Sequence, residues 1–357
     1  MACRPLKDRD AIISKEGIIF RVYGYWHPLT GYICDVEYAP STIYRSNNPK
    51  AIRQQGKNTF FKFYEHEGIT YIKKKFPQYA LYHVPIQEWL VGVTHNEVYR
   101  TRFPPIVLQQ ILSEEPKDEL ARTLFNVLDM ITDRSSLNTE NFGVFGSLLH
   151  AFYHPQYSDI DLTIIGKKEL YELLETLEEI NNEKNTTLLN EFKNTSLWSK
   201  SAWKFTELTM SEYGWYQRRK RIYNIFASKN SSRLIKIEFE PVMKEGDFTN
   251  EYDSTTQIRR LGMVEAYGTV INDDDSPYMP SIYEVEFDQI INSKVTDVRR
   301  IVSFVEEFRM QVRKNERIYV VGNLEQVSTQ NESFYQIVLT YCPQYYNQVL
   351  KLAKRDL

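Results

Sequence analysis

Residues 145–165 read FGSLLHAFYHPQYSDIDLTII, with two aspartates one residue apart at the start of an apolar run. The run is rich in aliphatic and β-branched residues, which is typical of a buried strand. Side chains at positions i and i+2 of a strand point to one face, so Asp159 and Asp161 should place two carboxylates side by side. Adjacent carboxylates repel each other unless a cation lies between them. The pattern therefore predicts a divalent metal site, and two Mg²⁺ ions about 3.5 to 4 Å apart are the usual arrangement in phosphoryl chemistry.

A Gly-Ser pair precedes these aspartates. Gly146 lets backbone amides approach an anion closely, and Ser147 can donate its hydroxyl at a helix start, where the helix dipole favours phosphate. Both halves of the stretch then favour one ligand, a metal-bound nucleoside triphosphate.

The composition limits the class of protein. The chain has 357 residues, more than one core usually supports, and a hydrophobic fraction of 42% that excludes a mainly disordered chain. A net charge of -3 gives no overall attraction for nucleic acid, so such binding needs a local basic patch. Three widely spaced cysteines without a CxxC pair argue against a disulfide framework or a zinc ribbon. With no apolar run near the roughly 20 residues that span a bilayer and no signal-peptide pattern, we expect a cytoplasmic protein without membrane contact.

Changes in pattern along the chain predict an α+β protein of three domains. Residues 1–105 alternate as strands do and end at a Pro-Pro stop, so they form a β-rich N-terminal domain. Residues 106–250 mix helical and strand patterns and form a central domain with a mixed sheet and helices. Residues 251–357 carry alternating runs between turns, which favour a small β-barrel-like C-terminal domain with a terminal helix.

Hydrophobic spacing predicts the individual elements. Helices are expected at 116–134, with Pro116 in the first turn, and at 167–183, with strands between them and another at 233–242. A further helical region is expected at 211–226. Three weaker expectations are strands at 60–74, one helix at 295–314 and a helical tail at 345–357.

The phrase GSLLHAFYHPQYSDIDL resembles the signature of the DNA polymerase beta-like nucleotidyltransferase superfamily, a Gly-Ser followed after about ten residues by Asp-x-Asp. That superfamily includes CCA-adding enzymes, poly(A) polymerases and minimal nucleotidyltransferases. The longer phrase FGVFGSLLHAFYHPQYSDIDLTIIG is similar to uncharacterised archaeal proteins that carry a nucleotidyltransferase domain. The resemblance implies a central nucleotidyltransferase domain in which Asp159 and Asp161 hold two Mg²⁺ or Mn²⁺ ions, and Gly146 and Ser147 clamp the triphosphate, for example of ATP.

Members of this superfamily usually take a third carboxylate from a neighbouring strand. The run IKIEFEPV offers Glu238 and Glu240, which share one face of the predicted strand. Glu238 is preferred as a catalytic and metal-binding residue, because Glu240 precedes Pro241 and can already be leaving the strand. A glutamate departs from the more usual aspartate, and the alternative that neither residue binds metal stays open.

Other polar clusters have competing interpretations. The cations Arg218, Arg219 and Lys220 lie among aromatic residues, which suits triphosphate or acceptor binding, or simply a solvated helix face. The pair His150 and His154 could share a helical face as zinc ligands, although packing is the plainer explanation. The three aspartates at 273–275 are interpreted as a turn. The three lysines at 73–75 are interpreted as protecting an exposed strand end.

The leading hypothesis is a metal-dependent enzyme that moves a nucleoside monophosphate from an NTP to a hydroxyl acceptor and releases pyrophosphate. The acceptor would be an RNA or other nucleic-acid end, or a protein side chain. One alternative is an inactive nucleotide-binding or nucleic-acid-binding module, and another is a toxin-like minimal nucleotidyltransferase. The sequence specifies neither the NTP nor the oligomeric state.

Overall fold

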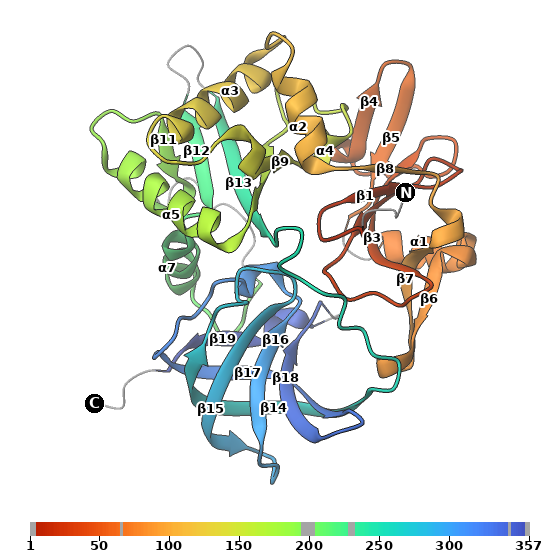
Figure 1. Cartoon of the computed structure of the whole chain (residues 1–357), viewed down its shortest axis with the longest axis vertical. Coiled ribbons are helices and arrows are strands. Elements are labelled where there is room, and N and C mark those ends of the chain that lie inside the picture. The colour runs from red at the N-terminus through yellow and green to blue at the C-terminus, as the bar shows by residue number, and fades with distance from the viewer. Residues whose placement is uncertain (1–4, 65–66, 194–203, 228–232, 342–343, 354–357) are drawn as a thin grey trace. The chain divides into compact units, whose positions relative to one another are not determined.

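The computed structural model (Figure 1) describes residues 5–64, 67–193, 204–227, 233–341 and 344–353. The fold is α+β, with three sheets and short helices. Contacts divide the chain into two compact units. The first comprises residues 1–83, 89–191 and 221–252, and the second comprises 84–88, 192–220 and 253–357. The division of the chain into three domains stays a prediction.

The N-terminal part of the first unit is an eight-stranded sheet in which β4, β5, β3, β2, β1 and β8 follow one another, and β7 joins β3 to β6. Its core contains Phe20, Val36 and Val93, and one helix, α1, packs on β3. The elements of this part are β1 (Ala11–Ile13), β2 (Ile19–Val22), β3 (Gly31–Pro40), η1 (Pro49–Ala51), β4 (Ile52–Gln55), β5 (Asn58–Lys62), α1 (Glu67–Lys75), η2 (Pro77–Tyr79), β6 (Ala80–His83), β7 (Glu88–Thr94), η4 (His95–Glu97) and β8 (Arg100–Arg102). Between β6 and β7 in the sequence, η3 (Val84–Ile86) belongs to the second unit.

The rest of the first unit is a five-stranded sheet in the order β11-β12-β13-β10-β9. The pair β10 and β13 is parallel, and the other pairs are antiparallel. Helix α5 contacts β10 and β11, and α3 contacts α5, so their leucines bury one face of the sheet. The elements are α2 (Pro104–Leu112), α3 (Glu119–Thr132), η5 (Thr139–Asn141), β9 (Phe142–Val144), α4 (Gly146–Leu149), β10 (Ile160–Ile165), α5 (Lys167–Asn182), β11 (Leu188–Asn190), η6 (Glu191–Lys193), β12 (Tyr223–Ala227) and β13 (Leu234–Val242).

The second unit is built on a six-stranded sheet. Five strands pair in a closed ring, β14-β15-β16-β18-β17 and back to β14, and β19 pairs with β17. Tyr283, Ile318 and Val320 belong to its core. The elements are α7 (Met210–Lys220), β14 (Gln257–Asn272), β15 (Ser281–Ile291), β16 (Val298–Ser303), η7 (Glu306–Phe308), β17 (Arg317–Ser328), β18 (Ser333–Leu339), η8 (Tyr345–Asn347) and β19 (Val349–Leu352).

The strongest periodic patterns are confirmed. The two expected helices appear as α3 and α5, and their periodic residues are buried, namely Leu120, Leu124, Leu128 and Ile131 in α3 and Leu170, Leu173, Leu174, Leu177 and Ile180 in α5. The expected strands at the aspartates and at 233–242 appear as β10 and β13. None of the helices in the described ranges is long and apolar enough to cross a bilayer.

Three expectations about elements are wrong. Residues 67–75 form helix α1 rather than a strand, and lysines 73–75 occupy its last turn, where the helix dipole favours cations. Residues 298–303 form β16 instead of a helix, because β15 and β18 flank this β-branched segment on both sides. The tail forms the short η8 and strand β19, which pairs with β17, and residues 354–357 lie outside the described residues.

Two smaller differences concern helix limits. Asp118 caps α3 by accepting a hydrogen bond from the amide of Ala121 at 2.9 Å, so Pro116 precedes the helix instead of lying in its first turn. The expected helical region at 211–226 ends at Lys220, and the residues from Tyr223 form β12.

Candidate functional site

The two aspartates lie at the start of β10, on the face of the sheet opposite its leucine-rich side. Asp161 pairs in register with Glu238 on β13, and Thr163 pairs with Glu240. Paired residues of neighbouring strands share a face, so the carboxylates of Asp161 and Glu238 belong to adjacent positions about 4.8 Å apart in backbone spacing. Asp159 is more exposed than Asp161 and Glu238, which are half-buried. The arrangement presents acidic groups at the end of two parallel strands.

The Gly-Ser pair lies directly against Asp161. The amide of Phe145 donates to the carbonyl oxygen of Asp161 at 3.0 Å, and Gly146 follows with a φ of +59°. A Cβ atom at Gly146 would lie 2.5 Å from Oδ2 of Asp161, closer than real contacts allow. Glycine is therefore required here both by the backbone conformation and by the approach of the carboxylate. Ser147 is 7% exposed in the first turn of α4.

The link between α4 and β10 is a hydrogen-bonded turn. The amides of Tyr157 and Ser158 donate to the carbonyl oxygen of His154, and the amide of His154 donates to Oγ of Ser158. Arg233, just before β13, donates to the carbonyl oxygens of Pro155 and Ser158. This anchoring ties the residue before Asp159 to the neighbouring strand.

Burial dominates the electrostatics of the site, and nearby cations oppose its effect. Burial raises the pKa of Asp161 to about 7, the nearby Lys62 opposes the shift, and the charges of Asp159 and Glu240 add to it. Loss of solvation also raises the pKa of Asp159, against the influence of Lys236. A divalent cation would reverse these shifts by stabilising the ionised forms.

The donor set fits a cation at Asp159 and Asp161. Their backbone positions are two residues apart, and Asp161 has a carboxylate neighbour across the strand pair in Glu238. Within the described ranges, no three His, Cys, Asp or Glu side chains already converge as a metal-binding group. Asp159 and Asp161 are the residues that could hold an ion here, with Glu238 at the adjacent position on β13.

Glu240 has a different environment. Its Oε2 accepts a hydrogen bond from the Arg9 guanidinium at 2.8 Å, and the side chains are 3% and 1% exposed. The same guanidinium lies over the Phe145 ring, 5.1 Å from its centroid. Glu240 thus joins the N-terminal segment to the sheet beside α4.

The predicted cation cluster belongs to the second unit, whereas the sheet site is built from the first. The Arg219 guanidinium pairs with Glu316 at 2.6 Å and lies 4.7 Å from the Trp215 ring centroid. Nζ of Lys220 donates to the carbonyl oxygen of Glu307 at 2.6 Å, and this lysine is 1% exposed. Arg218 is exposed on the same helix, α7. A role for these three residues in nucleotide binding stays a prediction.

The two histidines do not share a helical face. Helix α4 ends at Leu149, so His150 caps its C-terminus and is fully buried, while His154 lies in the following turn. The aspartates 273–275 lie in a turn, as expected.

Sequence reasoning missed the contribution of the N-terminal sheet to the site. Lys62 on β5 and Glu37 on β3 both influence the pKa of Asp161, and Asp161 in turn influences the buried Tyr38. These residues lie about a hundred positions away in sequence. No local pattern near them indicates a site.

Comparison with curated proteins finds an uncharacterised protein from Methanocaldococcus jannaschii that is 26% identical over 359 residues. The alignment covers 97% of this chain and 98% of that protein. No family model matches the chain, and no solved structure gives a match. A function for this chain therefore has to be inferred from the geometry of the site.

Proposed function

We propose that the protein is a metal-dependent nucleotidyltransferase that moves a nucleoside monophosphate from an NTP to a hydroxyl acceptor. The observation that carries this proposal is the contact between Gly146 and the Asp161 carboxylate, which brings the Gly-Ser turn and the Asp-x-Asp strand to one point. A glycine-serine helix start suits phosphates, and paired aspartates suit Mg²⁺ or Mn²⁺. In this proposal the five-stranded sheet with its helices is a nucleotidyltransferase domain, and the ring of strands in the second unit is a barrel-like accessory domain.

The residues have distinct roles in the proposed reaction. When bound, two divalent ions would polarise the α-phosphate and favour ionisation of the acceptor hydroxyl. Asp159 and Asp161 hold the ions, and backbone amides after Gly146 and the hydroxyl of Ser147 bind the phosphates. Glu238 accepts the hydroxyl proton as the acceptor oxygen bonds to the α-phosphorus, and the bond from that phosphorus to the β-phosphate oxygen breaks to release pyrophosphate.

The direct test uses each α-labelled NTP with Mg²⁺ or Mn²⁺ and a mixed pool of RNA, DNA and cell protein. We expect label on one macromolecular class with the unsubstituted chain and none with Asp159→Asn/Asp161→Asn. A matched control is Asp129→Asn, which changes an exposed aspartate on α3 and should leave labelling intact. Full labelling by the double variant would overturn the proposal.

A second candidate is a nucleotide-binding module without turnover. It is favoured by the absence, in the described part of the chain, of three converged metal-ligating side chains. Glu238→Gln separates the two functions. The enzyme should lose at least about a hundredfold in rate while keeping NTP affinity, because a general base contributes roughly 10² to 10⁴. A module would show metal-dependent NTP binding and no transfer in either form.

A further inference from the structure

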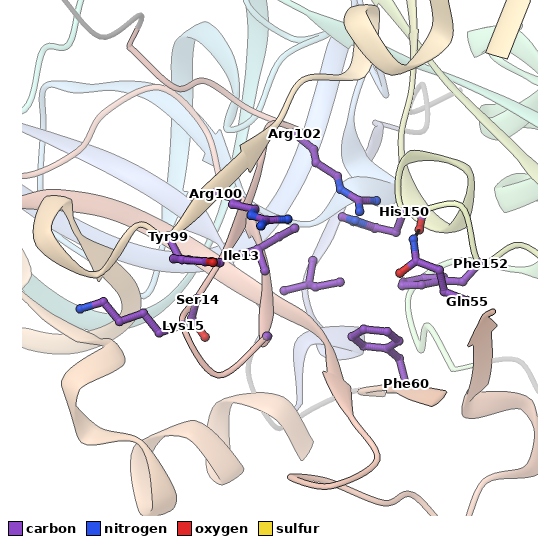
Figure 2. A pocket seen from close by; sticks show the side chains of 12 residues that line it. Ile13, Ser14, Lys15, Gln55, Phe60, Tyr99, Arg100, Arg102, His150 and Phe152 are labelled. Atoms are coloured by element: carbon purple, nitrogen blue, oxygen red, sulfur yellow. Dashed lines mark hydrogen bonds between the residues drawn. The ribbon is translucent and has the colours of Figure 1, made fainter. Parts of the chain in front are cut away.

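A pocket of about 180 Å³ lies in the first unit, between the N-terminal sheet and the C-terminal end of α4 (Figure 2). It is separate from the carboxylates, since its walls come from β1, β5, β8 and the residues that follow α4. Figure 2 shows the guanidinium groups of Arg100 and Arg102 reaching toward His150, with Phe60 and Phe152 on the other side and Lys15 pointing away.

The pocket gathers positive charge without a counter-charge. Arg100 and Arg102 are two residues apart on β8, and none of the described residues that line the pocket is acidic. Burial lowers the pKa of Arg102, and the charge of Arg100 lowers it further. One Nη of Arg102 donates to the carbonyl oxygen of Leu149 at 3.0 Å, and its guanidinium has further N–H groups. Two neighbouring guanidinium groups with room beside them form a site for an anion such as phosphate.

A buried polar ring adds a second, independent observation. His150 is 0% exposed, lines the pocket, and neither of its ring nitrogens has a hydrogen-bond partner. Leaving a buried polar group unsatisfied costs roughly 1–3 kcal/mol. A ligand in the pocket with donor or acceptor groups would remove that cost.

The apolar wall consists of aromatic rings. Phe60 is half-buried, and its ring centroid lies 5.4 Å from that of Phe152. The Phe152 ring stacks on His150 with 5.3 Å between the ring centroids. Opposite, Tyr99 is 55% exposed with the Arg100 guanidinium 5.1 Å from its ring centroid. Rings of this kind bind planar bases by stacking, with little dependence on base identity.

We propose that this pocket binds a nucleoside monophosphate unit, with its phosphate on Arg100 and Arg102, its base against Phe60 and a polar group on His150. The unit is either a free nucleotide or the phosphorylated end of an oligonucleotide. This binding is distinct from the transfer reaction and does not depend on the aspartates.

The test is calorimetric titration of the full chain in EDTA with AMP, GMP, CMP and UMP, a 5′-phosphorylated pentanucleotide, its 5′-hydroxyl form, and inorganic phosphate. We expect at least one nucleotide ligand to bind, and phosphate alone to bind at least about tenfold more weakly because it lacks a ring. Binding of mononucleotides alone assigns the pocket to free nucleotides, whereas tighter binding of the phosphorylated oligonucleotide assigns it to a chain end.

Variants locate the binding. Arg100→Gln and His150→Phe should each weaken it about tenfold, while Arg122→Gln, which changes an exposed arginine on α3, should alter it by less than about twofold. His150→Phe keeps the ring shape, and its melting temperature shows whether the fold survives. Binding should persist in Asp159→Asn/Asp161→Asn, so its loss there would place the nucleotide at the carboxylates. That result, no binding of any nucleotide ligand, or unchanged affinity in both pocket variants would overturn the inference.

Discussion

The half-buried position of Asp161 disfavours its ionised form, whereas the proposed metal site needs that form. Its pKa of about 7 lies above the ordinary value of 3.8. Between these two pH values the folded chain binds more protons than the unfolded chain, so the free energy of unfolding falls as pH rises through this window. Ionisation of Asp161 therefore destabilises the fold.

Asp161→Asn should remove part of that pH dependence. One pKa unit corresponds to about 1.4 kcal/mol, and partial solvation reduces the effect. Between pH 4 and pH 8 we therefore expect the unfolding free energy of the metal-free variant to fall by about 1–2 kcal/mol less than that of the unsubstituted chain. Urea unfolding in EDTA at both pH values measures this difference. Asp129→Asn is the control, and equal pH dependence in all three chains would contradict the assignment.

The neighbouring glutamates should separate stability from activity. Glu240→Gln removes the carboxylate that accepts from the buried Arg9, which keeps Asp8 at 3.6 Å, and should cost roughly 1.5–3 kcal/mol of unfolding free energy. Glu238→Gln is half-buried and should change that free energy by less than about 1 kcal/mol, while transfer is lost. Chemical unfolding and the labelling assay, applied to both variants, test the pair. If Glu240→Gln is stable but inactive while Glu238→Gln stays active, Glu240 is the catalytic residue and Glu238 is not.

Sequence reasoning found the residues of the site that lie close together in the chain. Gly146, Asp159 and Asp161 fall within one stretch of 16 positions, so their spacing by itself indicates shared geometry. The partner of Glu240 could not be found in this way, because Arg9 lies 231 residues away. The local sequence pattern of two distant segments does not indicate an ion pair between them.

Helix α4 helps to position the site although it is very short. Its four residues are held at one end by the approach of Gly146 to Asp161. At the other end, Arg102 and Gln55 donate to the carbonyl oxygens of Leu149 and His150 at 3.0 Å. Tertiary contacts at both ends therefore fix a helix that is too short to be stable alone.

Gly146→Ala should disrupt the contact between α4 and β10. The φ of +59° costs an alanine about 1–2 kcal/mol, and the clash with the Asp161 carboxylate adds to this. Gly56→Ala is a matched control, since Gly56 has a φ of +58° but nothing within 4 Å of the added Cβ. We expect both variants to lose stability in urea, with the larger loss and a loss of transfer at Gly146. Equal losses with full activity would show that the carboxylate contact has no role.

Local periodicity predicted those elements whose packing repeats along one face. Helices α3 and α5 carry leucines at helical spacing, and the spacing alone identifies them. The strands β16 and β19 were missed because hydrogen-bonding partners elsewhere in the chain determine their conformation. Short apolar segments of this kind are compatible with both the helical and the strand period.

At the scale of the whole molecule, the two units have separate cores and should unfold separately. Leu124 is fully buried in the first unit and Ile318 in the second. Truncating either side chain to alanine should lower the unfolding free energy of its unit by roughly 2–5 kcal/mol. We expect two calorimetric transitions, with Leu124→Ala lowering one and Ile318→Ala the other. A single transition lowered equally by both variants would show one cooperative unit instead.

The buried segment around Arg9 also has a consequence for synthesis on the ribosome. Nζ of Lys7 donates to the carbonyl oxygen of Met243, and the amide of Met243 donates to the hydroxyl of Tyr25 at 2.8 Å. Translation at about 5–20 residues per second separates the emergence of Arg9 from that of Glu240 by roughly 10–50 s. During that delay the first strands leave the exit tunnel with charged side chains whose partners are not yet made. The strands of the first sheet end at Arg102, so the nascent chain must stay soluble with that sheet complete while the segment that pairs with Arg9 is still being made.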